Sequence, residues 1–141
     1  MLSSYNATVV PHAAQRYNTV GDYFYRNPDA LSIRISDLNN TDYEFLILIH
    51  ELVEAYLCYK RDIFEAEITS FDVAHAGEAE PGLRPDAPYH MEHMFAESIE
   101  HQIADELGID WDDYGIAVAA LCEAPAVPQA ERYAPKEDES L

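Results

Sequence analysis

The chain has 141 residues, of which 48% are hydrophobic, so it is long enough for one ordinary domain with an apolar core. Its 27 acidic and 8 basic residues give a formal net charge of −19. This charge excludes direct binding to nucleic acid or to an anionic membrane, which both need basic surface, and suits cation binding, a basic protein partner or mimicry of nucleic acid.

The first 37 residues predict a small antiparallel β-sheet. Residues 6–10, NATVV, have the β-branched composition of a short strand. Residues 23–36 predict a β-hairpin, because Asn-Pro-Asp at 27–29 is typical of turns and the following LSIRIS segment alternates apolar and polar residues. The alternation places three apolar residues in the core and three polar residues outward: Leu31, Ile33 and Ile35, and Ser32, Arg34 and Ser36.

Four helices are expected to pack on this sheet. The apolar periodicity predicts them over residues 42–60, 64–76 and 89–107 and from residue 111 onward. Asn40 or Thr41 can cap the first helix and Asp110 the fourth, since short polar side chains accept hydrogen bonds from the free amides there. Gly77 and Gly108 are expected to end the second and third helices.

Two non-helical segments complete the predicted organisation. Residues 77–88 hold three prolines and two glycines and predict a loop, which we expect to be ordered beside a site. Residues 124–141 are rich in proline and charge and predict a disordered tail. The sequence therefore predicts a single α+β domain over 1–123 followed by this tail.

Cysteine usage and the start of the chain indicate a cytoplasmic protein. Cys58 and Cys122 lie in apolar helical patterns, which predicts buried free thiols. The first twelve residues lack the basic start and the long apolar run of a signal peptide, and no apolar run in the chain could span a bilayer.

The first helix carries charged residues inside its apolar run. Its apolar arc consists of Phe45, Leu46, Ile49, Leu52, Val53, Tyr56 and Leu57. His50 and Glu54 are four residues apart and stack at the edge of this arc, with Glu51 about a quarter turn away. Because charged groups are rarely buried unless they are paired or bind a metal, these side chains need partners.

The third helix has the same arrangement. Its apolar arc consists of Tyr89, Phe95, Ala96, Ile99, Ile103 and Leu107. His93 and Glu100 lie at the edge of that arc, and Glu97, His90 and His101 continue beyond it. If the two helices pack side by side, these edges meet and form a site for Zn²⁺ or another divalent metal, in a metal-binding domain. The candidate ligands are His50, Glu54, His93, Glu97 and Glu100.

A structural alternative exists for each of these residues. A helical His or Glu at the edge of a core is more often a solvated or hydrogen-bonded surface group than a ligand. His12 and His75 are isolated and are expected to be structural. Asp72 either orients a ligand imidazole or is a surface or capping residue.

The segment LIHELVEAYL resembles the active-site helix of zincin metallopeptidases. In that family a His-Glu-x-x-His motif provides two zinc ligands and a Glu that activates water. The resemblance implies that His50 is a ligand, that Glu51 is the general base, that Glu54 replaces the second His of the motif, and that His93 is the third ligand. It implies a zincin-like metal-dependent hydrolase, either a metallopeptidase or its inactive descendant.

Longer segments resemble a second group of proteins. IHELVEAYLC, FDVAH and EPGLRPDAPYHMEHMFAESIEHQIADELGIDW are similar to segments of small phage- and prophage-encoded proteins of unassigned function. This resemblance implies an accessory protein that works in the cytoplasm of a bacterial host cell. It implies no reaction.

Three functions are therefore compatible with the sequence. The first is the metal-dependent hydrolase, acting on a peptide or a small amide. The second is a non-enzymatic acidic inhibitor of a host defence or nucleic-acid-binding protein, which the net charge suggests. The third is a Mg²⁺-dependent nucleotide pyrophosphohydrolase, because Glu51-x-x-Glu54 and Glu97-x-x-Glu100 resemble the carboxylate pattern of that all-α family. The third function would give the histidines of the two helices no role in binding Mg²⁺.

Overall fold

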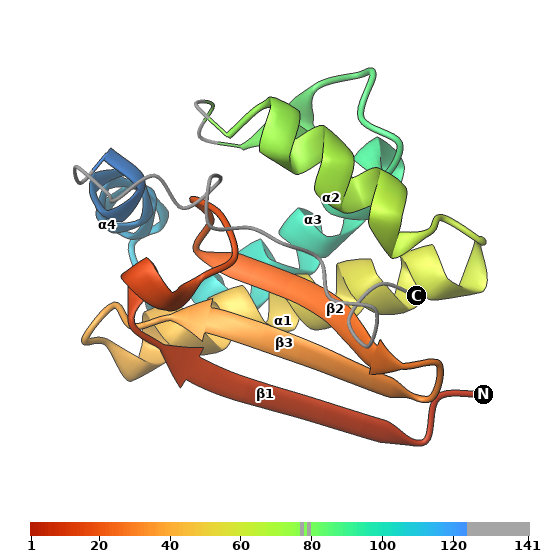
Figure 1. The fold of residues 1–141 in the computed structure, drawn as a ribbon. Coiled ribbons are helices and arrows are strands. Elements are labelled where there is room, and N and C mark those ends of the chain that lie inside the picture. The colour runs from red at the N-terminus through yellow and green to blue at the C-terminus, as the bar shows by residue number, and fades with distance from the viewer. Residues whose placement is uncertain (77, 79, 124–141) are drawn as a thin grey trace.

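The computed structural model describes residues 1–76, 78 and 80–123, which form a three-stranded sheet and four α-helices (Figure 1). This arrangement confirms the predicted α+β class. Gly77, predicted to end the second helix, and the predicted disordered tail, 124–141, lie outside the described residues.

The sheet consists of β1 (Ser4–Val10), β2 (Gly21–Asn27) and β3 (Ala30–Ser36) in the order β1-β3-β2. β2 and β3 form the predicted antiparallel hairpin, and the Asn27 side chain accepts a hydrogen bond from the Asp29 amide in its turn. β1 pairs with β3 in parallel. The sheet is therefore mixed, and the prediction of an antiparallel sheet is wrong for β1.

The connection after β1 accounts for this difference. A short turn would have paired β1 directly with β2, whereas parallel neighbours need a long connection. Residues 11–20, which include the 3₁₀ turn His12–Ala14, carry the chain across the end of the sheet before β2 begins. The hairpin then places β3 in the space between β1 and β2.

The hairpin buries both of its faces. Leu31, Ile33 and Ile35 are buried as predicted, but Ser32 and Ser36 are buried as well, which contradicts the outward position expected for them. The connection 11–20 covers that second face. The Ser36 hydroxyl is fully buried and hydrogen-bonds the side chains of His12 (2.9 Å) and Gln15 (3.1 Å).

The helices are α1 (Thr41–Lys60), α2 (Glu65–Ala74), α3 (His90–Glu106) and α4 (Trp111–Glu123), and a 3₁₀ turn η2 (Pro81–Leu83) lies between α2 and α3. The predicted ends are confirmed at three positions. Asn40 accepts a hydrogen bond from the Tyr43 amide, Asp110 accepts one from the Asp113 amide, and Gly108 has the positive φ of 70° that follows a helix end.

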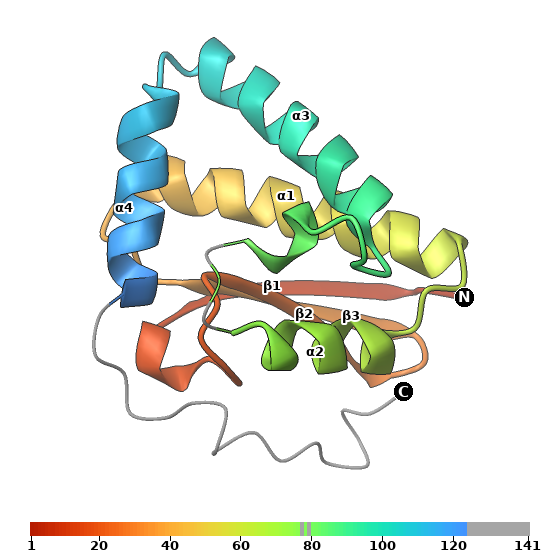
Figure 2. The ribbon, with the colours of Figure 1, turned by 90° about the horizontal axis from the view of Figure 1, so that it is seen from above.

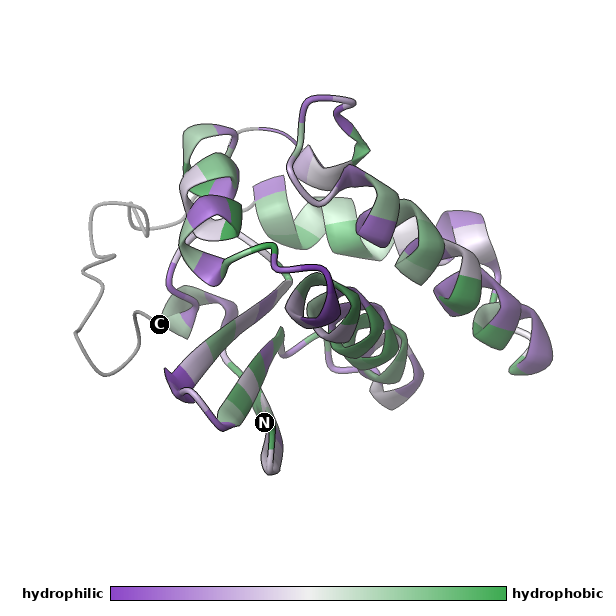
Figure 3. Ribbon diagram, turned by 90° about the vertical axis from the view of Figure 1, so that its right-hand side faces the viewer, coloured by the Kyte–Doolittle hydropathy of each residue, from purple (hydrophilic) through white to green (hydrophobic). Residues whose placement is uncertain are grey.

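α1, α3 and α4 lie on one side of the sheet, whereas α2 lies next to β2 on the side away from α1 (Figure 2). α1 lies against the sheet, α3 runs beside α1, and α4 crosses one end of the α1–α3 pair (Figure 2). In Figure 3 the strands alternate between hydrophilic and hydrophobic residues, whereas α1 is mainly hydrophobic. None of the helices in the described part of the chain has the length and apolarity that a membrane span requires.

Packing on two sides rotates the buried face of α1 away from the predicted arc. Phe45 and Tyr56 belong to that arc but are 43% and 42% exposed. Glu54, expected at its edge, is buried. α3 shows the same effect, since Phe95 is exposed while His93 is buried. Glu54 and His93 therefore face the interior, and part of the apolar surface of both helices faces outward.

Candidate metal centre

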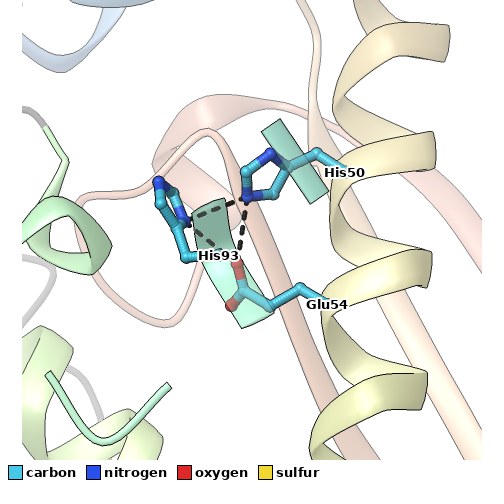
Figure 4. A group of neighbouring side chains, drawn as sticks. All are labelled: His50, Glu54 and His93. Carbon is cyan, nitrogen blue, oxygen red and sulfur yellow. Dashed lines mark hydrogen bonds and ion pairs between the residues drawn. The ribbon is translucent and has the colours of Figure 1, made fainter. Parts of the chain in front are cut away.

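α1 and α3 bring His50, Glu54 and His93 together (Figure 4). His50 Nε2 lies 3.0 Å from Glu54 Oε2 and 3.1 Å from His93 Nδ1, and His93 Nδ1 lies 3.1 Å from Glu54 Oε2. One donor atom from each side chain thus forms an almost equilateral triangle. We call these three residues the His–Glu–His triangle.

The His–Glu–His triangle has the dimensions of three ligands of one metal ion. In a tetrahedral zinc site with bonds of about 2.1 Å, neighbouring ligand atoms lie about 3.4 Å apart, which is within about 0.4 Å of the separations here. Two imidazoles and one carboxylate are also a common protein ligand set for catalytic zinc, in which a fourth position is left for water or substrate.

The hydrogen bonds within the triangle also favour a cation. Both imidazoles donate an N–H to the same oxygen, Glu54 Oε2, while their nitrogens lie only 3.1 Å apart. The two N–H hydrogens therefore point into one small volume. A divalent cation in that volume would replace both hydrogens and bind all three donor atoms.

Two further side chains hold the donor atoms in place. His50 Nδ1 donates to Glu100 Oε1 (2.7 Å), and the other oxygen of Glu100 accepts a hydrogen bond from Tyr114 (2.5 Å). Metal-binding histidines are oriented in this way by a carboxylate on the remote nitrogen. Glu100, predicted as a ligand, therefore contacts the candidate ligand His50 and lies outside the triangle. The Tyr23 hydroxyl donates to Glu54 Oε1 (2.8 Å), which leaves Oε2 for the triangle.

Burial and hydrogen bonding shift the pKa of each residue of the triangle. Burial acts to lower the pKa of His50, but hydrogen bonds to Glu100 and Glu54 outweigh it and raise the pKa to about 11. Burial also acts to lower the pKa of His93, but the carboxylates of Glu54 and Glu80 outweigh it and raise the pKa to about 9. Burial acts to raise the pKa of Glu54, but the two imidazoles lower it to about 2.

Glu51 lies on the neighbouring wall, against the start of β2. A Cβ atom on Gly21 would overlap the Glu51 carboxylate in its present position, so glycine leaves room for this side chain. Burial and the nearby charge of Glu54 raise the pKa of Glu51 well above its ordinary value. Glu51 is thus a carboxylate that retains its proton more readily than a surface glutamate.

A cavity of about 220 Å³ opens in front of the triangle. Residues of β2, α1, α2, η2, α3 and α4 form its wall. Eight acidic side chains line it, namely Asp22, Glu51, Glu54, Asp72, Glu78, Glu80, Glu97 and Glu100, and the described residues of the lining include no Lys or Arg. A cation is therefore favoured in this cavity and a phosphate is disfavoured.

Glu97, the remaining predicted ligand, belongs to a second group. It lies one turn after His93 on α3 and, together with Glu80 and His93, forms a second set of donor atoms within 4.8 Å of one another. Burial, followed by the charge of Glu80, raises the pKa of Glu97. Glu97 is therefore near the triangle but not part of it.

The other sequence candidates lie outside the triangle. Asp72 accepts hydrogen bonds from Tyr17 (2.9 Å) and Tyr89, and burial raises its pKa to about 7 although Tyr89 acts to lower it. It lines the cavity but hydrogen-bonds neither His50 nor His93. His90 donates to the Gly82 carbonyl oxygen (2.9 Å), and His101 stacks on the Trp111 ring (4.3 Å).

Sequence reasoning missed Tyr23, Glu80 and Tyr114. Tyr23 lies on β2, Glu80 in the loop before η2 and Tyr114 on α4, all outside the His–Glu–x–x–Glu helix, so no spacing rule connects them to that helix. The proline-rich segment 77–88 was expected to lie beside a site, and Glu80 comes from that segment.

Comparison of the chain with protein-family models, with curated proteins and with solved structures gave no match. The resemblances to zincins and to phage proteins therefore stay predictions. The assignment of the site rests on the geometry of the described residues.

Proposed function

We propose that this protein is a metal-dependent hydrolase of the zincin type, with Zn²⁺ or a similar divalent ion held by His50, Glu54 and His93. The observation that carries the proposal is the His–Glu–His triangle, whose donor atoms lie 3.0–3.1 Å apart on the wall of a cavity. A bound ion would act as a Lewis acid and lower the pKa of its water to about 7.

The protein's own residues have distinct roles in this proposal. Glu51 is the general base, because it lines the cavity beside Glu54 and its pKa is raised toward the range in which a carboxylate exchanges protons most effectively. Glu100 and Tyr114 keep His50 in one ring orientation. Tyr23 keeps Glu54 Oε2 directed at the triangle.

The cavity lining narrows the substrate class. Eight carboxylates would repel a nucleoside triphosphate, and both oxygens of Glu100 already accept hydrogen bonds from His50 and Tyr114. Both observations argue against a nucleotide pyrophosphohydrolase. They favour a hydrolase of peptides or small amides, because the bond cleaved in those substrates is uncharged.

The test combines metal analysis with one conservative variant. Wild-type protein supplemented with zinc should retain the metal through dialysis and hydrolyse an unstructured protein such as casein. Glu51→Gln should keep the metal and lose at least 100-fold in rate, since a general base contributes about 10²–10⁴-fold. Glu106→Gln, an exposed change on α3, is the matched control and should behave as wild type.

Two results would overturn the proposal. One is less than a tenth of an equivalent of zinc in the wild-type protein. The other is unchanged hydrolysis in Glu51→Gln. The folded double variant His50→Ala/Glu51→Gln separates the hydrolase from the acidic inhibitor, because an inhibitor that acts through surface charge should keep its effect on its target.

A further inference from the structure

His93 has a second nitrogen that the His–Glu–His triangle does not use. Nε2 is buried and has no hydrogen-bond partner within the described part of the chain, and the side chain as a whole is only 9% exposed. Figure 4 shows this nitrogen directed away from His50 and Glu54. Since nearly all buried polar atoms have a partner, an unsatisfied nitrogen in a cavity wall indicates a missing ligand.

Two carboxylates lie around this nitrogen. Glu80 Oε1 is 3.6 Å from His93 Nε2, which is within ion-pair distance but too long for a hydrogen bond. It is close to the separation of about 3.4 Å between two ligands of one tetrahedral ion. Glu97 completes the group, and the donor atoms of all three residues lie within 4.8 Å of one another. The loop before η2 supplies Glu80, and α3 supplies the other two.

We propose that Glu80, His93 Nε2 and Glu97 hold a second divalent cation, zinc or manganese, so that the His93 ring bridges two ions. This inference rests on the proposed function, because the first ion occupies the His–Glu–His triangle at Nδ1. The Nε2 proton passes to solvent as the second ion binds. The ring then carries one negative charge and binds one ion through each nitrogen.

The charges around the pair of positions suit two cations. Two divalent ions bring four positive charges. The wall nearby contributes Glu51, Glu54, Glu80, Glu97 and Glu100, and no Lys or Arg is present among the described lining residues. With the negative charge of the bridging ring, these groups carry up to six negative charges, of which one divalent ion compensates two and a second ion two more. In hydrolases a second ion can stabilise the attacking and leaving oxygens together.

The experiment measures the zinc stoichiometry of the full chain by equilibrium dialysis and elemental analysis, with circular dichroism as a check of folding. Wild type should bind two equivalents. Glu80→Gln/Glu97→Gln should bind one, and this variant should fold because Glu80 is exposed and Glu97 is only half-buried. The control Asp86→Asn/Glu106→Gln loses the same charge from exposed sites near the same elements and should still bind two.

A complementary variant separates the two sites. His50→Ala/Glu54→Gln should retain one equivalent at the second site. If the wild type binds one equivalent of zinc and Glu80→Gln/Glu97→Gln binds the same amount with the same affinity, the second site is overturned and the first is unaffected. If the wild type binds one equivalent of zinc and the variant binds it more weakly, the second site is also overturned, because Glu80 would then only orient His93 toward the first ion. Absence of bound zinc in the wild type overturns both the proposed function and this inference.

Discussion

The first equivalent of zinc is expected to release about two protons when it binds at pH 7. In the free protein the pKa of His50 is raised to about 11 and that of His93 to about 9, so both imidazoles are protonated at pH 7. Glu54, whose pKa is lowered to about 2, is already ionised. Each imidazolium must lose the proton on its triangle nitrogen before it can bind an ion.

The same values fix how the affinity depends on pH. Because the two pKa values are raised, protons compete with zinc throughout the neutral range, and the competition weakens as the pH rises. The logarithm of the apparent association constant should increase by about two for each pH unit below about pH 7, where a metal-bound water would keep its proton. The contribution of His93 to this slope, about one, should disappear above about pH 9, because His93 is then already neutral.

Calorimetry in several buffers measures the proton number directly. The apparent binding enthalpy at pH 7 is plotted against the ionisation enthalpy of each buffer, and the slope gives the number of protons released. A slope near zero would refute the reasoning, because an ion would then bind without displacing the imidazole protons. Tyr56→Phe, a change on the exposed face of α1, is a matched control and should give the wild-type slope.

Three further outcomes are expected. Tyr114→Phe removes the hydrogen bond to Glu100, the carboxylate that orients His50. It should weaken zinc binding roughly tenfold, as measured by chelator competition. Gly21→Ala drives a Cβ into Glu51 and should lower the free energy of unfolding by about 1–3 kcal/mol in urea titrations. Arg16→Ala leaves two buried carboxylates unpaired and should cost about 3–5 kcal/mol, whereas Arg84→Ala breaks only exposed ion pairs and should unfold at nearly the wild-type urea concentration.

Local features of the fold could be predicted from the sequence because they depend on neighbouring residues. The cap at Asn40, the helix end at Gly108 and the alternation of the third strand follow from backbone hydrogen bonds that span only a few residues. The same is true of one side of the site. His50 and Glu54 share a face because four residues make about one helical turn, and the structure places their donor atoms 3.0 Å apart.

Contacts between distant segments were decided by tertiary packing. The parallel pairing of β1 depends on how far the connection 11–20 reaches, and the burial of Ser36 depends on what that connection covers. Phe95 faces outward because packing against α1 selects a different face of α3 from the most apolar one. No local pattern contains this information.

The sequence by itself indicated His50, Glu54 and His93 as candidate ligands and determined that His50 and Glu54 share a turn of helix. Only the tertiary structure determined that His93 joins His50 and Glu54, that Glu100 supports His50 from its far side, and that Glu80 approaches the second nitrogen of His93. The physical reason is that helical periodicity fixes angles around one axis. The distance and rotation between two axes are set by how all the side chains between them pack.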